Sequence, residues 1–245
     1  MKVVQFSDTH LGPNFTHKQL TELVNQMNKL KPDIVVFTDD VIDNVGEYGS
    51  QRQKAQFILT QIHTLLGTYA VFGNHDRGGG SGSYLYNKEN VKNSLYKKLM
   101  EGVGFTVLVN KIDQITIAGL DDFLLVMPII SGTLQQLQQQ DSNLLLVHKP
   151  NAADKILEYP VDFQISGHSH GGKVRFPFLK PIITNPLANQ YVKGMYSLEG
   201  KRKPLQLYVN RGGGTTRASF RLFCKLELSI FILQRVDMES NTVTN

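Results

Sequence analysis

The sequence predicts an α/β protein in which two mixed β-sheets pack together and helices cover their outer faces. Short, nearly continuous apolar runs recur at residues 3–6, 34–37, 70–72, 144–147 and 163–165, as in strands covered on both sides. Helical patterns separate the earlier runs, and this alternation predicts βαβ units. After residue 174 the pattern is mostly strands, which indicates a second sheet.

Three helices are predicted in the first part of the chain. The first follows Thr16, which forms a capping-box pattern with Gln19, and it ends before Pro32. The others are predicted over residues 51–66 and 88–100, because each range carries apolar side chains at helical spacing.

The later elements are predicted to be strands. Residues 105–109 and 112–117 flank Asn110 and Lys111 and predict a hairpin, and further strands are expected over 174–178, 205–209 and 225–233. In the last range, Leu226, Leu228, Ile230 and Ile232 alternate with polar residues, as in a half-buried strand. We expect one domain over residues 1–245, with the second-sheet strands mainly after residue 104 and after residue 174.

Composition sets broad limits on function. The chain has 245 residues and is 41% hydrophobic, which is enough for a sizeable core. The formal net charge of +5 is spread along the chain; solvated surface charge explains it most simply, although an anionic substrate, nucleic acid or a membrane surface would also suit it. A lone cysteine, Cys224, excludes an internal disulfide. No signal peptide or membrane-spanning stretch is visible, so we expect a cytoplasmic protein, with peripheral membrane association and a removed N-terminal anchor left open.

Candidate metal ligands follow five of the predicted strands. The side chains are Asp8 and His10; Asp39, Asp40 and Asp43; Asn74, His75 and Asp76; His148; and His168 with His170. Each cluster alone has a simpler explanation, such as a helix cap or a turn. These simpler explanations do not account for all five clusters together, because the carboxyl ends of strands are where open α/β sheets bind ligands. Five of the seven histidines lie in these clusters.

The order of these motifs resembles that of the calcineurin-like metallophosphoesterases over about residues 2–173. The stretches HGGKVRFPF and YVNRGGGTT are similar to those of a bacterial branch that includes membrane-associated phosphoesterases and UDP-2,3-diacylglucosamine hydrolases. The resemblance implies a four-layer α-β-β-α sandwich, which agrees with the two-sheet prediction.

The resemblance also implies a role for each ligand. Asp8, His10 and His170 would hold a first metal ion, Asn74, His148 and His168 a second, and Asp40 would bridge the two. His75 would stand near the scissile phosphate, Asp76 would orient His75, and Asp43 would support the ligands from behind.

These residue types suit phosphoester hydrolysis. Two divalent ions about 3.5–4 Å apart neutralise phosphate oxygens and hold a hydroxide for in-line attack. Mixed imidazole, carboxylate and amide ligands without cysteine favour Mn, Fe or Zn. Because all the expected ligands are present, a catalytically inactive scaffold is disfavoured.

Three positions add charge near this site. Asp39 stands where the family usually has Gly, and Asp tolerates a left-handed backbone better than most residues. Lys173, where the branch often has Gln, would lie close to phosphate. Arg211 would form part of a surface turn, or else point at the substrate phosphate or at an acidic structural partner.

The sequence leaves the substrate and the oligomeric state open. A phosphorylated small molecule, lipid-linked or nucleotide-sugar phosphoester is favoured, and a nuclease is the alternative, disfavoured because no aromatic-basic stripe is visible. The apolar residues 123–127, with 176–181, are expected to pack under a helix or to contact an apolar part of the substrate.

Overall fold

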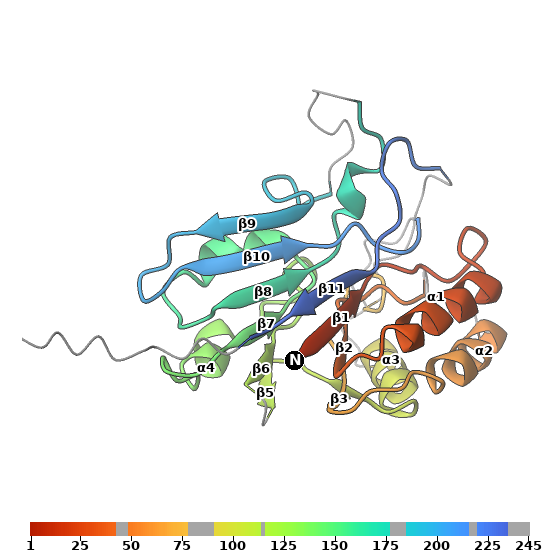
Figure 1. Cartoon of the computed structure of the whole chain (residues 1–245), viewed down its shortest axis with the longest axis horizontal. Helices are drawn as coiled ribbons and strands as arrows, with labels where there is room; N and C mark the ends of the chain where they lie inside the picture. Colours follow the sequence, from red (N-terminus) through yellow and green to blue (C-terminus); the bar gives the residue numbers. More distant parts are fainter. Residues whose placement is uncertain (43–48, 78–90, 114–115, 177–184, 216–219, 235–245) are drawn as a thin grey trace, which may run out of the picture.

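A computed structural model describes residues 1–42, 49–77, 91–113, 116–176, 185–215 and 220–234. Two sheets lie face to face within it, and helices flank both (Figure 1). Among these residues no helix is both long and apolar enough to cross a bilayer.

The first sheet has five strands in the order β11-β1-β2-β3-β4. Their bounds are β1 Lys2–Phe6, β2 Ile34–Phe37, β3 Gly67–Ala70, β4 Phe105–Val107 and β11 Ser229–Ile232. The four strands from β1 to β4 run parallel, and β11 pairs antiparallel with β1 at the edge.

The second sheet has six strands in the order β5-β6-β7-β8-β10-β9. Their bounds are β5 Lys111–Asp113, β6 Ile117–Gly119, β7 Leu144–Leu146, β8 Phe163–Ser166, β9 Gly194–Leu198 and β10 Leu205–Val209. The strands β6, β7, β8 and β10 run parallel, whereas the edge strands β5 and β9 are antiparallel to their neighbours.

Helices form the outer layers. On the first sheet they are α1 His17–Lys29, α2 Gly49–Leu59 and α3 Val91–Glu101; near the second they are α4 Ile130–Leu134 and the 3-10 helix η1 Pro150–Lys155. One buried apolar cluster joins α1, α2 and α3 to the first sheet, and another joins α4 and η1 to the second. The short 3-10 helix η2, His170–Gly172, follows β8 and belongs to the site.

A third apolar cluster fills the space between the sheets. It contains Val3, Val36 and Val71 from the first sheet or its immediate end, and Leu146 and Ile165 from the second. With the two outer clusters it establishes the predicted order of four layers, α-β-β-α.

The start of the chain matches its prediction closely. Thr16 caps α1 with the predicted capping box: its side chain accepts from the backbone N–H of Gln19, whose side chain accepts from the N–H of Thr16. Leu20, Val24 and Met27 form the buried face of the helix.

The second helix is shorter than predicted, and the third, α3, lies where it was predicted as far as the described residues extend. The prediction of a helix over 51–66 was too long, since α2 ends at Leu59. Beyond it, the Asn28 side chain donates to the carbonyl of Gln61 and accepts from the N–H of His63, which draws the backbone away from the helical path. The start predicted for the third helix, at residue 88, lies outside the described residues.

The predicted hairpin around Asn110 was wrong. β4 pairs parallel with β3 in the first sheet, and β5 pairs with β6 in the second, so the chain changes sheets between them. Asn110 has a positive φ of 50° and accepts from the N–H groups of Asp121 and Ile129, which fixes this crossover.

The prediction for the last strand, over 225–233, was wrong about its buried face and its length, since β11 covers only Ser229–Ile232. In β11, Ser229 is buried while Ile230 and Ile232 are 47% and 58% exposed. Asn210 donates to the hydroxyl of Ser229, and Phe231 contacts the rings of Phe163 and Tyr208, which fixes this register. β4 and β11 therefore belong to the first sheet, although the strands after residue 104 were expected mainly in the second.

Of the strand predicted over 174–178, Val174 forms an isolated bridge with Leu222, and 177–178 lie outside the described residues.

Candidate metal centre

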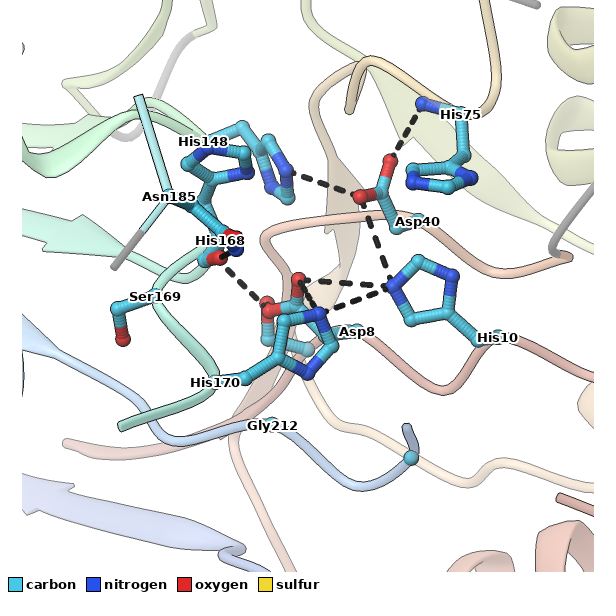
Figure 2. Close-up of polar contacts among 12 residues, drawn as sticks. Asp8, His10, Asp40, His75, His148, His168, Ser169, His170, Asn185 and Gly212 are labelled. Atoms are coloured by element: carbon cyan, nitrogen blue, oxygen red, sulfur yellow. Dashed lines mark hydrogen bonds and ion pairs between the residues drawn. The ribbon is translucent and has the colours of Figure 1, made fainter. Parts of the chain in front are cut away.

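Five loops bring their polar side chains together at the carboxyl ends of parallel strands from both sheets (Figure 2). These loops follow β1, β2, β3, β7 and β8. Ten of the side chains predicted in these loops are at most 7% exposed: Asp8, His10, Asp39, Asp40, Asn74, His75, Asp76, His148, His168 and His170. Burial of so many polar groups is costly unless they are hydrogen-bonded or hold an ion.

The first ligand group contains Asp8, His10 and His170. The Nε2 atoms of His10 and His170 lie 3.2 Å apart, and Asp8 Oδ1 lies 3.9 Å and 3.5 Å from them. Asp8 Oδ2 accepts from the hydroxyl of Ser7 and the N–H of His168, whereas Oδ1 has no hydrogen bond among the described residues. A lone carboxylate oxygen facing two imidazole nitrogens suits a cation.

Asp40 lies between the first group and a second one formed with His148 and His168. Its Oδ2 is 3.7 Å from His10 Nε2 and 3.2 Å from His148 Nε2, while Oδ1 accepts from the backbone N–H of His75. Figure 2 shows the carboxylate between these rings. One carboxylate is thus within reach of both ligand groups.

The orientation of His148 is fixed from behind. Its Nδ1 lies 2.6 Å from the carbonyl oxygen of Thr38 and donates to it, which directs the lone pair of Nε2 towards Asp40. That Nε2 is buried and has no hydrogen-bond partner among the described residues. The donor set therefore fits a pair of divalent ions.

The surroundings favour an ionised Asp40 and a neutral imidazole at two of the ligand histidines; at His148 burial lowers the pKa, but the charge of Asp40 outweighs it and raises that pKa. Burial disfavours the ionised form of Asp40, but the positive charges available on His148 and His75 outweigh this and hold its pKa well below the usual value. Burial lowers the pKa of His168, with Lys149 adding to the effect, and burial and His10 lower that of His170. Both imidazoles are thus kept neutral, with a lone pair to donate.

The ligand loops depend on unusual backbone geometry. Positive φ angles occur at Asp8, His10, Asp40, His168 and His170, with values from 45° to 68°. Non-glycine residues rarely adopt this region, and such strain is concentrated at functional sites. Asp39 also has a φ of 65°, so the turn keeps the left-handed backbone expected there. Burial and the charge of Asp76 raise the pKa of Asp39 well above its usual value.

Asp76 connects two of these loops. Its Oδ2 accepts from the N–H groups of Asp40 and Gly73, and its Oδ1 accepts from that of Val41. These contacts fix the backbone around the bridging carboxylate. The role predicted for Asp76 in orienting His75 stays a prediction.

The remaining predicted residues lie around the edge. Lys173 is 5% exposed and follows η2, where its charge helps to lower the pKa of His170. Arg211 uses its Nε and its backbone N–H to bond Glu227 Oε2, which is the acidic structural partner considered from the sequence. Asp43 lies outside the described residues.

Two basic residues near the ligands were missed. Lys149 is fully buried, and its ammonium donates to Asn74 and contacts His168. Arg221 donates to the carbonyl oxygens of His170 and Gly214, and its Nη2 lies 3.3 Å from His170 Nδ1. Neither stands in a recognisable motif: Lys149 was visible only as the neighbour of His148, and Arg221 comes close through the fold alone.

Comparison with known proteins relates this chain to phosphoesterases that use metal ions. The family model described as calcineurin-like phosphoesterase matches residues 1–172. The metallophosphoesterase YkuE of Bacillus subtilis is 39% identical over 241 residues, covering 95% of this chain and 79% of the relative. The UDP-2,3-diacylglucosamine pyrophosphatase LpxG of Chlamydia trachomatis is 27% identical over 267 residues, covering 90% of this chain and 80% of the relative.

A solved structure supports the fold. The crystal structure of TT1561 of Thermus thermophilus superposes with a TM-score of 0.51 at 9% identity, covering 94% of this chain and 97% of that one. The family match spans all five ligand loops, including the residues that gather from both sheets. The chain therefore belongs to the calcineurin-like phosphoesterase family and is a metal-dependent hydrolase of phosphate esters.

Proposed function

We propose that this chain hydrolyses a phosphate ester or anhydride with two divalent ions, of Mn, Fe or Zn, bound together at the carboxyl edge of its sheets. The observation that carries this proposal is the position of Asp40 Oδ2, which lies 3.7 Å from His10 Nε2 and 3.2 Å from His148 Nε2. A carboxylate oxygen within reach of an imidazole from each ligand group suits a bridging role.

The chain's own residues have different roles in this proposal. Asp8, His10 and His170 would hold one ion, Asn74, His148 and His168 would hold the other, and Asp40 would be a ligand of both. Such an ion pair supplies an activated hydroxide and neutralises phosphate oxygens. His75, whose backbone N–H is held by Asp40 Oδ1, stabilises the developing charge or protonates the leaving oxygen.

We further propose a nucleotide-sugar or lipid-linked phosphoester as the substrate. The likeness to LpxG, a UDP-2,3-diacylglucosamine pyrophosphatase, supports this class. A nuclease is the alternative, and the modest net charge of +5 gives it little support.

An apolar part of the substrate has two candidate contact surfaces. In the loop after β6, Phe123 packs against the outer core of the second sheet, but Leu124 and Met127 are 41% and 89% exposed. Beside the first ligand group, a pocket of about 590 Å³ is lined by Phe15, Arg221 and other residues of both polarities. Of the predicted stretch 176–181, only Phe176 is described, and it is exposed.

Peripheral contact with a membrane would suit the surface around this pocket, whose lining includes Phe223 and Lys225. The bridge between Val174 and Leu222 joins two segments that expose Phe176, Phe220 and Phe223. Lys225 is exposed in one of these segments, and such a mixture of apolar and cationic side chains suits an anionic lipid surface.

The test of the reaction is a hydrolysis panel with added Mn²⁺ on monoester, diester and nucleotide-sugar substrates. Asp40→Asn should retain the fold and lose nearly all turnover, because the amide cannot neutralise two ions. Asp154→Asn is the control, since Asp154 is exposed and accepts from the hydroxyl of Tyr191. Hydrolysis by Asp40→Asn at the rate of the control would reject the proposal.

The test of the apolar part compares kcat/KM for acylated and deacylated forms of one phosphoester below the micelle threshold. The acylated form should be favoured, since buried apolar surface contributes about 25 cal/mol per Å². The double variant Leu124→Ser, Met127→Ser should lose that preference. Equal values for the two substrates, or unchanged selectivity in a folded double variant, would reject a role for the loop.

A further inference from the structure

The ammonium of Lys149 lies among side chains that the proposed function assigns to the second metal ion. It donates to Asn74 Oδ1 and lies 3.0 Å from Nδ1 and 3.3 Å from Nε2 of His168. Its side chain is fully buried, directly after the ligand His148. A buried ammonium and a divalent cation repel each other strongly at such distances.

The contact with His168 concerns the lone pair that a metal ion needs. His168 Nε2 lies 2.9 Å from the carbonyl oxygen of Pro186, a contact that places the ring proton on Nε2. The lone pair is then on Nδ1, the ring nitrogen nearer to the ammonium of Lys149. One lone pair cannot serve an ammonium and a metal ion together.

Asp122 provides an alternative acceptor for the ammonium. It is fully buried, and its Oδ2 accepts from the N–H groups of Leu124 and Leu125. Its Oδ1 lies 3.4 Å from Lys149 Nζ and has no hydrogen-bond partner among the described residues. A small shift would thus exchange Asn74 and His168 for this carboxylate oxygen, without leaving a buried charge uncompensated.

We propose that Lys149 and the second metal ion compete for Asn74 Oδ1 and His168 Nδ1, so that the two ions bind in sequence with unequal affinity. The ion held by Asp8, His10 and His170 binds first and tightly. The second ion binds more weakly, because it must displace the ammonium towards Asp122. This inference rests on the proposed two-metal function and makes Lys149 the residue that sets how fully the second position is filled.

The test is calorimetric titration with Mn²⁺, together with electron paramagnetic resonance to detect magnetically coupled Mn pairs. The variant Lys149→Met keeps an unbranched side chain that is one atom shorter and removes its charge. Its second binding step should tighten by at least about tenfold, with the first step unchanged, because the competing charge is gone. The matched control is Lys201→Met, whose side chain is 79% exposed, and it should titrate like the unmodified protein.

A second variant should change the affinity of the second binding step in the opposite direction. Asp122→Asn keeps a side-chain oxygen for the N–H groups of Leu124 and Leu125 but removes the charge that would receive the ammonium. Its second step should weaken by at least about tenfold. This variant decides the matter if Lys149→Met does not fold, which thermal unfolding by circular dichroism will show.

The outcomes separate this inference from the function on which it rests. A second step that is unchanged or weaker in Lys149→Met, or not weakened in Asp122→Asn, overturns the competition and leaves two-metal chemistry intact. If no form, including the unmodified protein, binds a second ion, both the competition and the two-metal function are rejected.

Discussion

Individual residues at this site are held by contacts that leave one atom available for a ligand. Asp8 offers Oδ1 because Ser7 and His168 occupy Oδ2, and Asp40 offers Oδ2 because the N–H of His75 occupies Oδ1. The same contact brings His75 close to the ligands: its ring centroid lies 4.6 Å from that of His10. Geometry alone therefore allows His75 to bind metal or to act on the substrate.

Replacing His75 by Asn distinguishes these roles. We expect metal content to stay unchanged and turnover to fall by about 10²–10⁴-fold, as for the loss of acid–base assistance. Elemental analysis and kcat measured in parallel check this, with His63→Asn as the control because His63 is exposed in the turn after α2. Loss of metal in His75→Asn would mean that this residue is a ligand.

At the scale of elements, the loop after β10 is secured against the segment before β11. Glu227 accepts from Arg211 Nε at 2.8 Å and from the hydroxyl of Tyr208 on β10. The same loop continues to Gly213 and Gly214, whose N–H groups donate to the carbonyl oxygens of Ser7 and Asp8. Glu227 thus supports the first ligand loop from the outside.

This contact predicts a pH-dependent contribution to stability. Burial opposes the ionisation of Glu227, but hydrogen bonds from Arg211 and Tyr208 outweigh it and lower the pKa below the usual 4.5. A lowered carboxyl pKa stabilises the fold above pH 4.5, and this contribution is lost as the pH falls through the folded-state pKa.

Glu227→Gln should therefore lower the free energy of unfolding by about 1–2 kcal/mol at pH 7. The difference from the unmodified protein should shrink in acid, as the native carboxylate becomes protonated. Urea unfolding at several pH values from 7 to below 4 measures this. Glu158→Gln is the control, because Glu158 is 57% exposed and its ion pair with Lys201 is long, at 4.0 Å. A deficit that does not change with pH would contradict the proposed charge effect.

At the scale of the whole molecule, the site spans the seam between the two sheets. Asp8, His10 and Asp40 follow strands of the first sheet, whereas His148, His168 and His170 follow strands of the second. Ions bound there would link the sheets where the apolar cluster between them ends. Metal binding should consequently stabilise the fold as a whole.

Thermal unfolding with and without Mn²⁺ tests this linkage. An ion present at a hundred times its Kd adds about 2.7 kcal/mol to the free energy of unfolding. For a chain of this size that corresponds to a rise in Tm of about 5–10 °C. EDTA should reverse the rise, and Asp40→Asn should lose most of it. An equal rise in that variant would show that the added metal acts elsewhere.

The sequence by itself determined the fold family and the residues that gather at the strand ends. Short buried parallel strands require continuous apolar runs, and the residues after their carboxyl ends share one edge of the sheet. Asp8 and Asp40 on one sheet, and His148 and His168 on the other, could therefore each be placed together without coordinates. The helix α1 was equally predictable, because its cap and its apolar face are both local.

Only the tertiary structure decided features that depend on distant partners. The end of α2 is set by Asn28, the crossover at Asn110 by Asp121 and Ile129, and the buried face of β11 by Asn210 and the rings around Phe231. Lys149 and Arg221 belong to the same class, since their contacts with His168 and His170 join residues 19 and 51 positions apart. A local pattern records which face a residue prefers, but burial and hydrogen bonding with remote groups decide where it finally lies.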